Sequence, residues 1–252
     1  MVRLDELVSY CDELLMAAKF NDYAPNGLQV QGWPEVKKLV TGVTACQALI
    51  DAAVVAQADA ILVHHGFFWK GEAPVVTGLK RRRLGALIEN NISLIAYHLP
   101  LDAHPSLGNN AELARILGLV VEGRFGRDNG DCLAMYGALP APMSVHHFMD
   151  HLHFKLGRKA LHLGGGSEDI VRVGWCSGAA QGYIEAATQL GVQAFISGEV
   201  SEHTTHFARE SGIHYFAAGH HATERYGVQA LGAHLAQRFD IEHQFVDINN
   251  PV

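Results

Sequence analysis

Residues 58–66 read Ala-Asp-Ala-Ile-Leu-Val-His-His-Gly, and this stretch decides the fold. The apolar run at 60–63 predicts a buried strand that ends directly at the two histidines. A helix is predicted before this strand, over about 46–56, and another after it, over 79–89. Because strands that alternate with helices form parallel βαβ units, the sequence predicts an α/β fold.

The same alternation extends in both directions along the chain. Further strands are predicted over 38–44, 92–97, 171–176, 194–197 and 213–218. Further helices are predicted over 4–20, 109–117, 182–190, 201–210 and 223–239. Residues 58–66 align with 192–200, and 92–98 align with 213–219, which indicates either an internal duplication or two similar βαβ units. A duplication would give two related α/β halves, with mainly parallel strands, that face each other around a shared site.

The chain is predicted to divide into a first α/β half, a connecting subdomain and a second α/β half. Their predicted bounds are 1–121, 122–169 and 170–252. The connecting part departs from the βαβ rhythm and carries several turn signals. These are Asp128-Asn129-Gly130, Pro140, Pro142 and Gly164-Gly165-Gly166.

The composition is that of a globular protein, with 48% hydrophobic and 18% charged residues. A net charge of −7 argues against binding to nucleic acid or to an anionic membrane. The first residues include Asp5 and Glu6, unlike a secretory signal, and polar residues interrupt the most apolar stretch, 39–63. The four cysteines form no CxxC pair, so we expect reduced thiols and a cytoplasmic protein.

Histidine and carboxylate residues gather at four predicted strand ends. The ends carry His64-His65-Gly66, His98 with Asp102 and His104, Gly198-Glu199, and Gly219-His220-His221-Ala-Thr-Glu224. Parallel α/β sheets bind ligands just beyond the carboxyl ends of their strands. One such histidine alone is more often a satisfied core residue. Four coincident clusters would be costly to bury without compensation, and metal binding provides it.

The residue types in these clusters indicate which metals would suit the site. Imidazole together with carboxylate suits zinc, iron or manganese. None of the clusters contains cysteine, which argues against a closed structural zinc site. Because a carboxylate can bridge two ions, the pattern favours a two-metal hydrolytic site over a single ion.

The motifs resemble those of the Nif3-like dinuclear-metal family, whose bacterial members are often called GTP cyclohydrolase 1 type 2 homologues; the YbgI-like bacterial proteins are especially similar. The resemblance covers nearly the whole chain and is least evident in the connecting segment. It rests on Asp22-Tyr-Ala-Pro-Asn-Gly-Leu-Gln29, Val63-His-His-Gly-Phe-Phe-Trp-Lys70, His98-Leu-Pro-Leu-Asp102, Gly108-Asn-Asn110, Ser197-Gly-Glu-Val-Ser201 and Gly219-His-His-Ala-Thr-Glu224.

The resemblance implies a ligand set, a fold and an assembly. The implied ligands of two divalent metal ions are His64, His65, Asp102, His220 and Glu224. The implied fold is a two-part α/β structure, and the implied assembly is a ring-shaped homohexamer. Glu224 is the expected bridge between the ions. If its helix begins near residue 222 or 223, the carboxylate lies in the first turn, where the helix dipole favours negative charge.

Two further residues at the strand ends are candidates for moving protons. His98 is either a metal ligand or, as we favour, a partner that orients a ligand. Glu199 is either a general base or orienting group, or a plain structural hydrogen-bonding residue. His104 and His221 adjoin the implied ligands and are interpreted as bystanders. Asp22 and Asn26-Gly27 are expected to fix the first loop, and an approach of Asn26 to the site is the alternative.

Three other features have a functional and a structural interpretation. Residues 144–156 contain His146, His147, His151 and His153, but an apolar stripe at helical spacing favours a helix with solvated histidines. The Lys-Arg-Arg-Arg run at 80–83 could hold phosphate or nucleic acid, although a solvated charged turn is the default. The three glycines at 164–166 lack the Lys and Ser/Thr of a P-loop and are interpreted as a turn.

Two classes of function remain open at the level of sequence. The first is a metal-dependent hydrolase acting on a nucleotide or another phosphate-bearing small molecule. GTP ring opening is the version implied by the family name, but no guanine pocket is identifiable in the sequence. The second class is a non-enzymatic metal-binding scaffold, or a regulatory or metal-storage ring protein.

Overall fold

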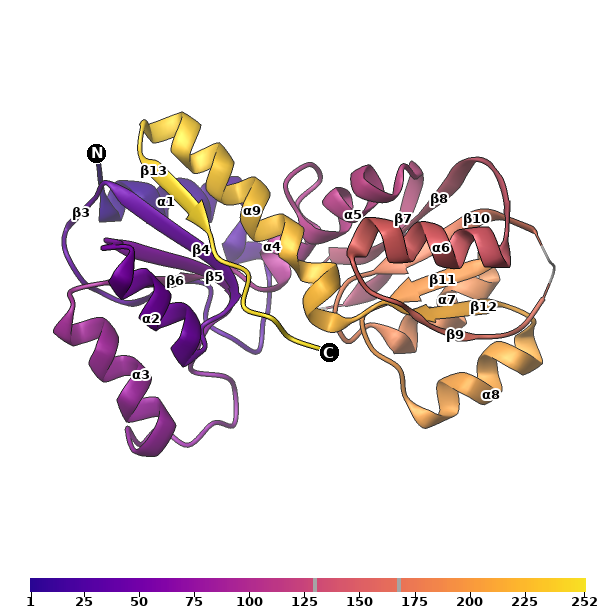
Figure 1. The fold of residues 1–252 in the computed structure, drawn as a ribbon, viewed down its shortest axis with the longest axis horizontal. Helices are drawn as coiled ribbons and strands as arrows, with labels where there is room; N and C mark the ends of the chain where they lie inside the picture. Colours follow the sequence, from indigo (N-terminus) through magenta and orange to yellow (C-terminus); the bar gives the residue numbers. More distant parts are fainter. Residues whose placement is uncertain (129–130, 167–168) are drawn as a thin grey trace. The chain divides into compact units, whose positions relative to one another are not determined.

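The computed structural model describes residues 1–128, 131–166 and 169–252. Contacts between residues divide the chain into two compact units, both visible in Figure 1. Unit 1 contains Met1–Gly108 and Gly227–Asn249, and unit 2 contains Asn109–Tyr226 and Asn250–Val252. Among the described residues, no helix is long and apolar enough to cross a membrane.

Unit 1 is built on a five-stranded sheet with the strand order β13-β4-β5-β6-β2. The strands are β2 (Gly27–Val30), β4 (Lys38–Thr44), β5 (Ala60–His65), β6 (Ser93–Ala96) and β13 (Glu242–Phe245). Four of them run parallel, and β2 pairs with β6 in the antiparallel direction. A separate antiparallel pair joins β1 (Val2–Arg3) to β3 (Glu35–Val36).

Helices cover both faces of this sheet (Figure 1). One face packs against α1 (Leu4–Leu14) and the later part of α9 (His220–Phe239), and the other packs against α2 (Gln47–Val55) and α3 (Gly78–Glu89). Successive residues of a strand point to opposite faces, so Leu62 enters the first core while Ile61 and Val63 enter the second. A strand buried on both faces needs apolar residues throughout, which is why 60–63 is a continuous apolar run.

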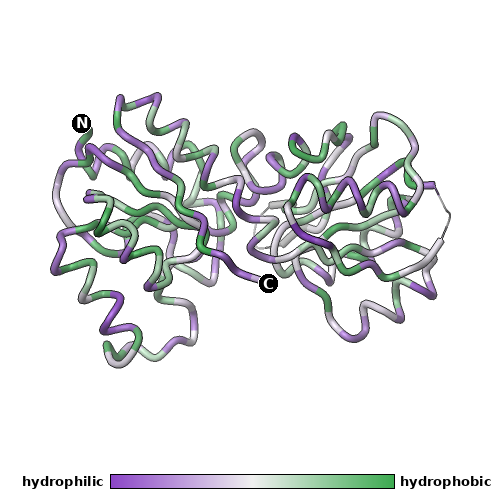
Figure 2. The backbone as a smooth tube through the Cα atoms, viewed as in Figure 1, coloured by the Kyte–Doolittle hydropathy of each residue, from purple (hydrophilic) through white to green (hydrophobic). Residues whose placement is uncertain are grey.

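Unit 2 is built on a six-stranded sheet with the order β7-β8-β10-β11-β12-β9. Its strands are β7 (Val120–Asp128), β8 (Asp131–Ser144), β9 (Leu161–Leu163), β10 (Asp169–Cys176), β11 (Ala194–Ser197) and β12 (His214–Ala217). The three central strands β10, β11 and β12 are parallel, and the outer pairings are antiparallel. Figure 2 shows hydrophobic residues along the central strands of each unit.

The helices of unit 2 also lie on both faces of its sheet (Figure 1). One core contains Trp175, Phe148 and Phe216, together with residues of α5 (Asn109–Leu117) and α6 (Val145–Leu156). Its other described helical elements include η2 (Gln181–Tyr183), α7 (Ile184–Gln189), α8 (Glu202–Ser211) and the first part of α9. The parallel strands β10, β11 and β12 thus repeat the strand–helix order of β4, β5 and β6.

The predicted α/β class and the central parallel strands are confirmed. The segment 122–169, set apart in the sequence as a connecting subdomain, lies within unit 2, because β8 pairs with β10 in the same sheet. Unit 1 also includes 227–249, so it is formed by two segments that are separate in the sequence. Of the predicted turn at 128–130, Asn129 and Gly130 lie outside the described residues.

Two helix boundaries differ from the prediction. The helix predicted over 4–20 ends at Leu14, and a short 3₁₀ helix, η1 (Ala17–Lys19), follows Met16, whose φ of 50° is left-handed and cannot continue an α-helix. Helix α9 begins at His220, three residues before the predicted start at 223. Glu224 therefore follows the first turn of α9 and does not lie within it, so the dipole argument for its charge loses force.

Candidate metal centre

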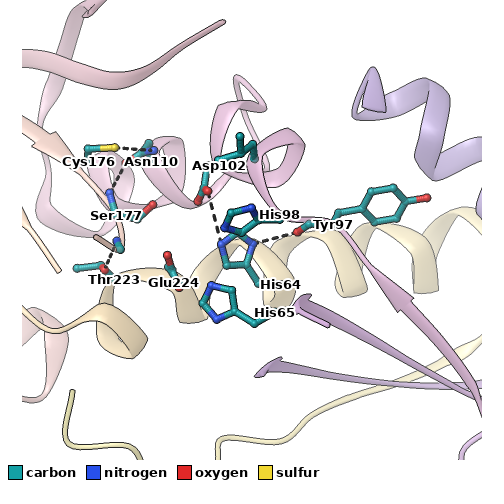
Figure 3. Close-up of polar contacts among 12 residues, drawn as sticks. His64, His65, Tyr97, His98, Asp102, Asn110, Cys176, Ser177, Thr223 and Glu224 are labelled. Carbon is teal, nitrogen blue, oxygen red and sulfur yellow. Dashed lines mark hydrogen bonds and ion pairs between the residues drawn. The ribbon is translucent and has the colours of Figure 1, made fainter. Parts of the chain in front are cut away.

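His64 lies in the last part of β5 and is fully buried. Its Nδ1 lies 2.9 Å from the carbonyl oxygen of Tyr97, and its Nε2 lies 3.5 Å from Oδ2 of Asp102 (Figure 3). A carbonyl oxygen only accepts hydrogen bonds, so Nδ1 carries a proton, and in the neutral ring the lone pair lies on Nε2. This is the tautomer that a metal-binding imidazole requires.

His65 and His98 complete a group of three imidazoles in unit 1. The ring centroid of His64 lies 4.6 Å from that of His65 and 5.1 Å from that of His98. Each of the three offers one nitrogen, and these nitrogens lie within 4.8 Å of one another, close enough to hold one metal ion. The sequence favoured an orienting role for His98, whereas its position in this group makes it a candidate ligand as well.

Asp102 reaches the same region from a short helix that the sequence did not predict. This helix, α4 (Leu99–Ala103), starts directly after His98 and has proline near its N-terminus, where the missing N–H group costs nothing. The Asp102 side chain is buried. A buried carboxylate beside a buried imidazole is a donor set that suits a divalent cation.

Asp22 fixes the orientation of His98. One oxygen of its carboxylate lies 2.9 Å from Nδ1 of His98, and the other accepts hydrogen bonds from Asn26 Nδ2 and Leu99 N, both at 3.0 Å. Burial alone would raise the pKa of Asp22, but these hydrogen bonds and the nearby imidazole outweigh it and hold the pKa at about 2. Asp22 is thus ionised, and His98 presents its other nitrogen, Nε2, to the imidazole group.

Unit 2 contributes a second set of donors at the start of α9. His220 and Glu224 are four residues apart and therefore lie on one face of the helix, with Nε2 of His220 3.1 Å from Oε2 of Glu224. Nδ1 of His220 lies 2.7 Å from Oε1 of Glu199, which follows β11. Burial lowers the pKa of His220, but the two carboxylates outweigh it and raise the pKa to about 9. The two carboxylates therefore favour positive charge at this position.

The loop after β10 packs closely against this pair. Gly178 has a φ of 65°, and a Cβ atom there would overlap Oε1 of Glu224. Its amide N donates to Oγ1 of Thr223 at 3.1 Å, and the amide N of Ser177 donates to Oδ1 of Asn110 at 2.8 Å (Figure 3). Only glycine has both the backbone freedom and the missing side chain that this approach needs.

These supporting residues were not assigned a role from the sequence. Asn110 is fully buried and also accepts, through its main-chain carbonyl, the indole N–H of Trp175 at 2.9 Å. Gly108-Asn-Asn110 was noticed only as part of the resemblance. The Ser177-Gly178 pair stands at the end of a predicted strand, as the histidine clusters do, and this position is the signal that could have identified it.

Other histidines considered in the sequence, in α6 and at position 104, are not among the described residues grouped as possible metal donors. Of the histidines in α6, His146, His147 and His153 are exposed, while His151 hydrogen-bonds the carbonyl oxygen of Leu117 at 2.9 Å. Among the described residues, none of these four belongs to a group of side chains that could hold a metal ion. Nδ1 of His104 accepts from the amide of Leu107 at 3.0 Å.

The basic run at 80–83 lies in α3, where Arg81 and Arg82 are exposed while Lys80 and Arg83 are half-buried. Lys80 forms an ion pair with Glu72 at 3.3 Å and lies over the ring of Phe68, 5.1 Å from its centroid. Residues 164–166 form no helix or strand, and a Cβ at Gly165 or Gly166 would overlap backbone atoms near Gly212. These contacts account for both features without a bound phosphate.

Comparison with known proteins gives consistent matches over the whole chain. The family model Duf34/NIF3 (NGG1p interacting factor 3) matches residues 2–251. A Pseudomonas aeruginosa protein called GTP cyclohydrolase 1 type 2 homolog is 56% identical over 250 residues, covering 99% of both chains. An Escherichia coli K12 protein of the same name is 51% identical over 247 residues, covering 98% of both chains.

Solved structures match equally well. A structure described as protein ybgI, of unknown function, superposes with a TM-score of 0.96 at 50% identity and covers 100% of both chains. The crystal structure of TTHA1606 from Thermus thermophilus superposes with a TM-score of 0.90 at 35% identity, again over 100% of both chains. These likenesses agree with the family match over the full length.

Proposed function

Because the chain belongs to the Duf34/NIF3 family, we propose that it is a two-metal hydrolase acting on a nucleotide or another phosphate-bearing small molecule. The observation that carries the proposal is that each unit has a set of metal-donor side chains at its strand ends. Three imidazoles and a carboxylate gather in unit 1, and an imidazole between two carboxylates lies in unit 2. This chemistry suits iron, zinc or manganese.

We assign the two ions to His64, His65, Asp102, His220 and Glu224. Glu224 is the proposed bridge, because one carboxylate can offer an oxygen to each ion. When bound, two such ions supply Lewis acidity and activate water near neutral pH. The protein's own part is to present Nε2 of His64, fixed through its bond to Tyr97, and the buried carboxylates of Asp102 and Glu224.

Glu199 and His98 are the proposed proton-transfer residues. The Glu199 side chain is 36% exposed and is therefore open to water or a substrate. His98 is held by Asp22 and can either bind metal or relay a proton through its other nitrogen. Glu199 also orients the imidazole of His220, to which it is hydrogen-bonded, and His98 is itself oriented by Asp22.

Metal content and turnover should be measured together on purified protein. We expect two metal ions per chain by elemental analysis, and metal-dependent activity in a screen of nucleotides and simple phosphoesters. His64→Ala should reduce both. His147→Ala, on the exposed face of α6, is the matched control and should change neither.

The alternative is a metal-binding scaffold or a regulatory or storage ring without turnover. It is favoured by the name of the family, which describes a factor that interacts with another protein and names no reaction. A protein that holds two ions with no position open to substrate, and that turns over none of the screened compounds, would support the alternative and exclude the hydrolase.

The proposed assembly and location follow from the resemblance and the cysteines. We propose a homohexamer with no nucleic-acid or membrane partner, and a cytoplasmic location. The four cysteines form no CxxC pair, which suits a reducing compartment.

A further inference from the structure

Two aromatic side chains stand beside the imidazole group of unit 1. The ring centroid of Trp69 lies 5.2 Å from that of His98 and 5.9 Å from that of His65. The ring of Tyr23 lies 5.0 Å from His98 and 6.0 Å from Trp69, at an interplanar angle of 33° to the indole. The two rings thus form a continuous aromatic wall next to the candidate metal ligands.

The loop that carries Trp69 is held in a defined shape. Gln29 clamps it from β2, accepting from the amide of Phe67 at 2.7 Å and donating to the carbonyl of Phe67 at 3.2 Å. The amide of Lys70 donates to the carbonyl of Tyr23 at 2.8 Å and so ties the two aromatic segments together. The indole N–H of Trp69 donates to the carbonyl of Gly66 at 3.2 Å. The wall is therefore preorganised for binding.

The aromatic wall is partly exposed to solvent. Tyr23 is 47% exposed, and Trp69 is half-buried. The neighbouring Phe68 adopts a left-handed φ of 65°, which is rare for a bulky residue, and its ring is already covered by Lys80. A strained backbone and exposed aromatic rings next to a reactive centre are typical of a ligand-binding surface.

We propose that Tyr23 and Trp69 bind a flat, uncharged heteroaromatic ring of the substrate by stacking, and that the anionic group of the same molecule reaches the metals. This inference rests on the proposed hydrolase and specifies its substrate class. An uncharged ring fits better than a cation, because bound divalent ions beside His65 and His98 repel positive charge. Stacking accepts any planar base, so the wall selects for ring-bearing substrates over simple phosphates.

Tryptophan fluorescence tests the contact directly. The chain has three tryptophans, of which Trp175 is fully buried in unit 2 and Trp33 is exposed. In the Trp33→Phe variant, loaded with redox-inert zinc, guanosine 5′-monophosphate should quench the emission through Trp69. Ribose 5-phosphate, which has the same phosphate without the ring, should leave the emission unchanged. Equal responses to the two ligands would overturn the proposal.

Calorimetric binding then assigns the contact to residues. Trp69→Ala and Tyr23→Ala should each weaken guanosine monophosphate binding by about fivefold to a hundredfold, while ribose 5-phosphate binding stays unchanged. Trp69→Phe should retain most of the affinity, and Trp33→Ala, which removes the other tryptophan of unit 1, should retain all of it. If neither alanine variant alters the preference for the ring, the wall does not bind it.

Zinc content separates stacking from a positioning role. If Trp69→Ala loses zinc while Tyr23→Ala binds both ligands normally, Trp69 only orients His65 and His98, and the proposal fails. A failure of the proposed hydrolase activity gives a different set of results. Zinc-dependent phosphoester turnover without a preference for the ring would support the hydrolase and refute the stacking site. Ring-selective binding without turnover of any screened compound would support the stacking site and refute the hydrolase.

Discussion

Glu224 is the residue on which the proposed two-metal arrangement depends most. Its side chain is buried and lies 3.1 Å from His220, one helical turn earlier. Replacing it with Gln keeps its size but removes the charge that would balance two cations. We expect Glu224→Gln to lower the occupancy of both metal positions, whereas His65→Ala should weaken chiefly one.

Elemental analysis of the parent and both variants measures these occupancies. Two metals per chain at parental affinity in Glu224→Gln would show that Glu224 is not the bridge. Glu199, which contacts the same imidazole, would then be the next candidate.

Gly178 provides a second prediction at the level of one residue. In Gly178→Ala the new methyl group would collide with Glu224, and the left-handed backbone would add a strain of roughly 1–3 kcal/mol. We expect lower metal affinity together with a lower unfolding temperature. Gly182→Ala is the matched control, because a Cβ at Gly182 meets no atom within 4 Å. Equal metal affinity in the two variants would mean that the close approach of this loop is unimportant for the site.

Helix α6 tests the interpretation of the histidine-rich segment. Its buried residues Phe148, Leu152 and Leu156 account for the helix, and Oγ of Ser144 caps its N-terminus by accepting from the amide of His147 at 3.3 Å. Replacing His147 and His151 with Ala should leave the metal content unaltered, with a small loss of stability from the bond to Leu117. Loss of one equivalent of metal would instead identify a site on this helix.

The edge pairing of β9 with β12 should make stability depend on pH. Nε2 of His162 lies 3.1 Å from Nδ1 of His214, and its ring stacks on Phe216. The pKa of His162 is lowered from its ordinary value of 6.5, mainly by burial and to a smaller extent by the neighbouring His214. Below that value the unfolded chain binds a proton that the folded chain resists, so stability falls as the pH falls.

Urea denaturation at pH 5 and pH 7.5 measures this effect. His162→Gln should show a smaller difference between the two pH values than the parent does. His146→Gln, at an exposed position, should behave as the parent. An unchanged difference in His162→Gln would mean that this histidine does not contribute.

The elements divide into those that local pattern predicts and those that it does not. Strands β4 and β11 and helix α5 match the predicted ranges because a continuous apolar run or a clear helical period marks each. Strands β2 and β13 were missed, since Gly-Leu-Gln-Val and Glu-His-Gln-Phe lie at sheet edges, and edge strands need few apolar residues.

The site divides in the same way. Clustered histidines at strand ends predicted His64 and His65 after β5 and His220 after β12, because parallel strands bring such ends to one edge of their own sheet. The buried polar residues Asn110 and Thr223 gave no local signal, since their burial is a product of tertiary packing. The place of His98 among the imidazoles likewise depends on Asp22, far away in the sequence.

At the scale of the whole molecule, the proposed homohexamer is tested by light scattering of the purified protein. The measured mass should be six times that of one 27.4 kDa chain. A monomer at micromolar concentration would contradict the assembly and would leave the two-metal proposal to stand on the donor sets alone.

The proposed ligands come from both units, and this predicts how metal affects unfolding. A ligand that binds only the folded state stabilises it by about 2.7 kcal/mol at a hundred times its dissociation constant. If each unit supplies part of the donor set, metal should raise the unfolding midpoint of both units together. If all the metal bound within one unit, only that unit would be stabilised.

Each unit contains its own tryptophan reporter, so the two cases can be separated. Trp175→Phe leaves tryptophans only in unit 1, and the Trp33→Phe, Trp69→Phe double variant leaves one only in unit 2. Metal-free and zinc-loaded samples of both should be heated while emission is followed. We expect zinc to raise both midpoints by a few degrees, and Glu224→Gln to abolish both shifts. A shift confined to the unit 1 reporter would place the metal on His64, His65, His98 and Asp102 alone and would refute the proposal that the ions join the two units.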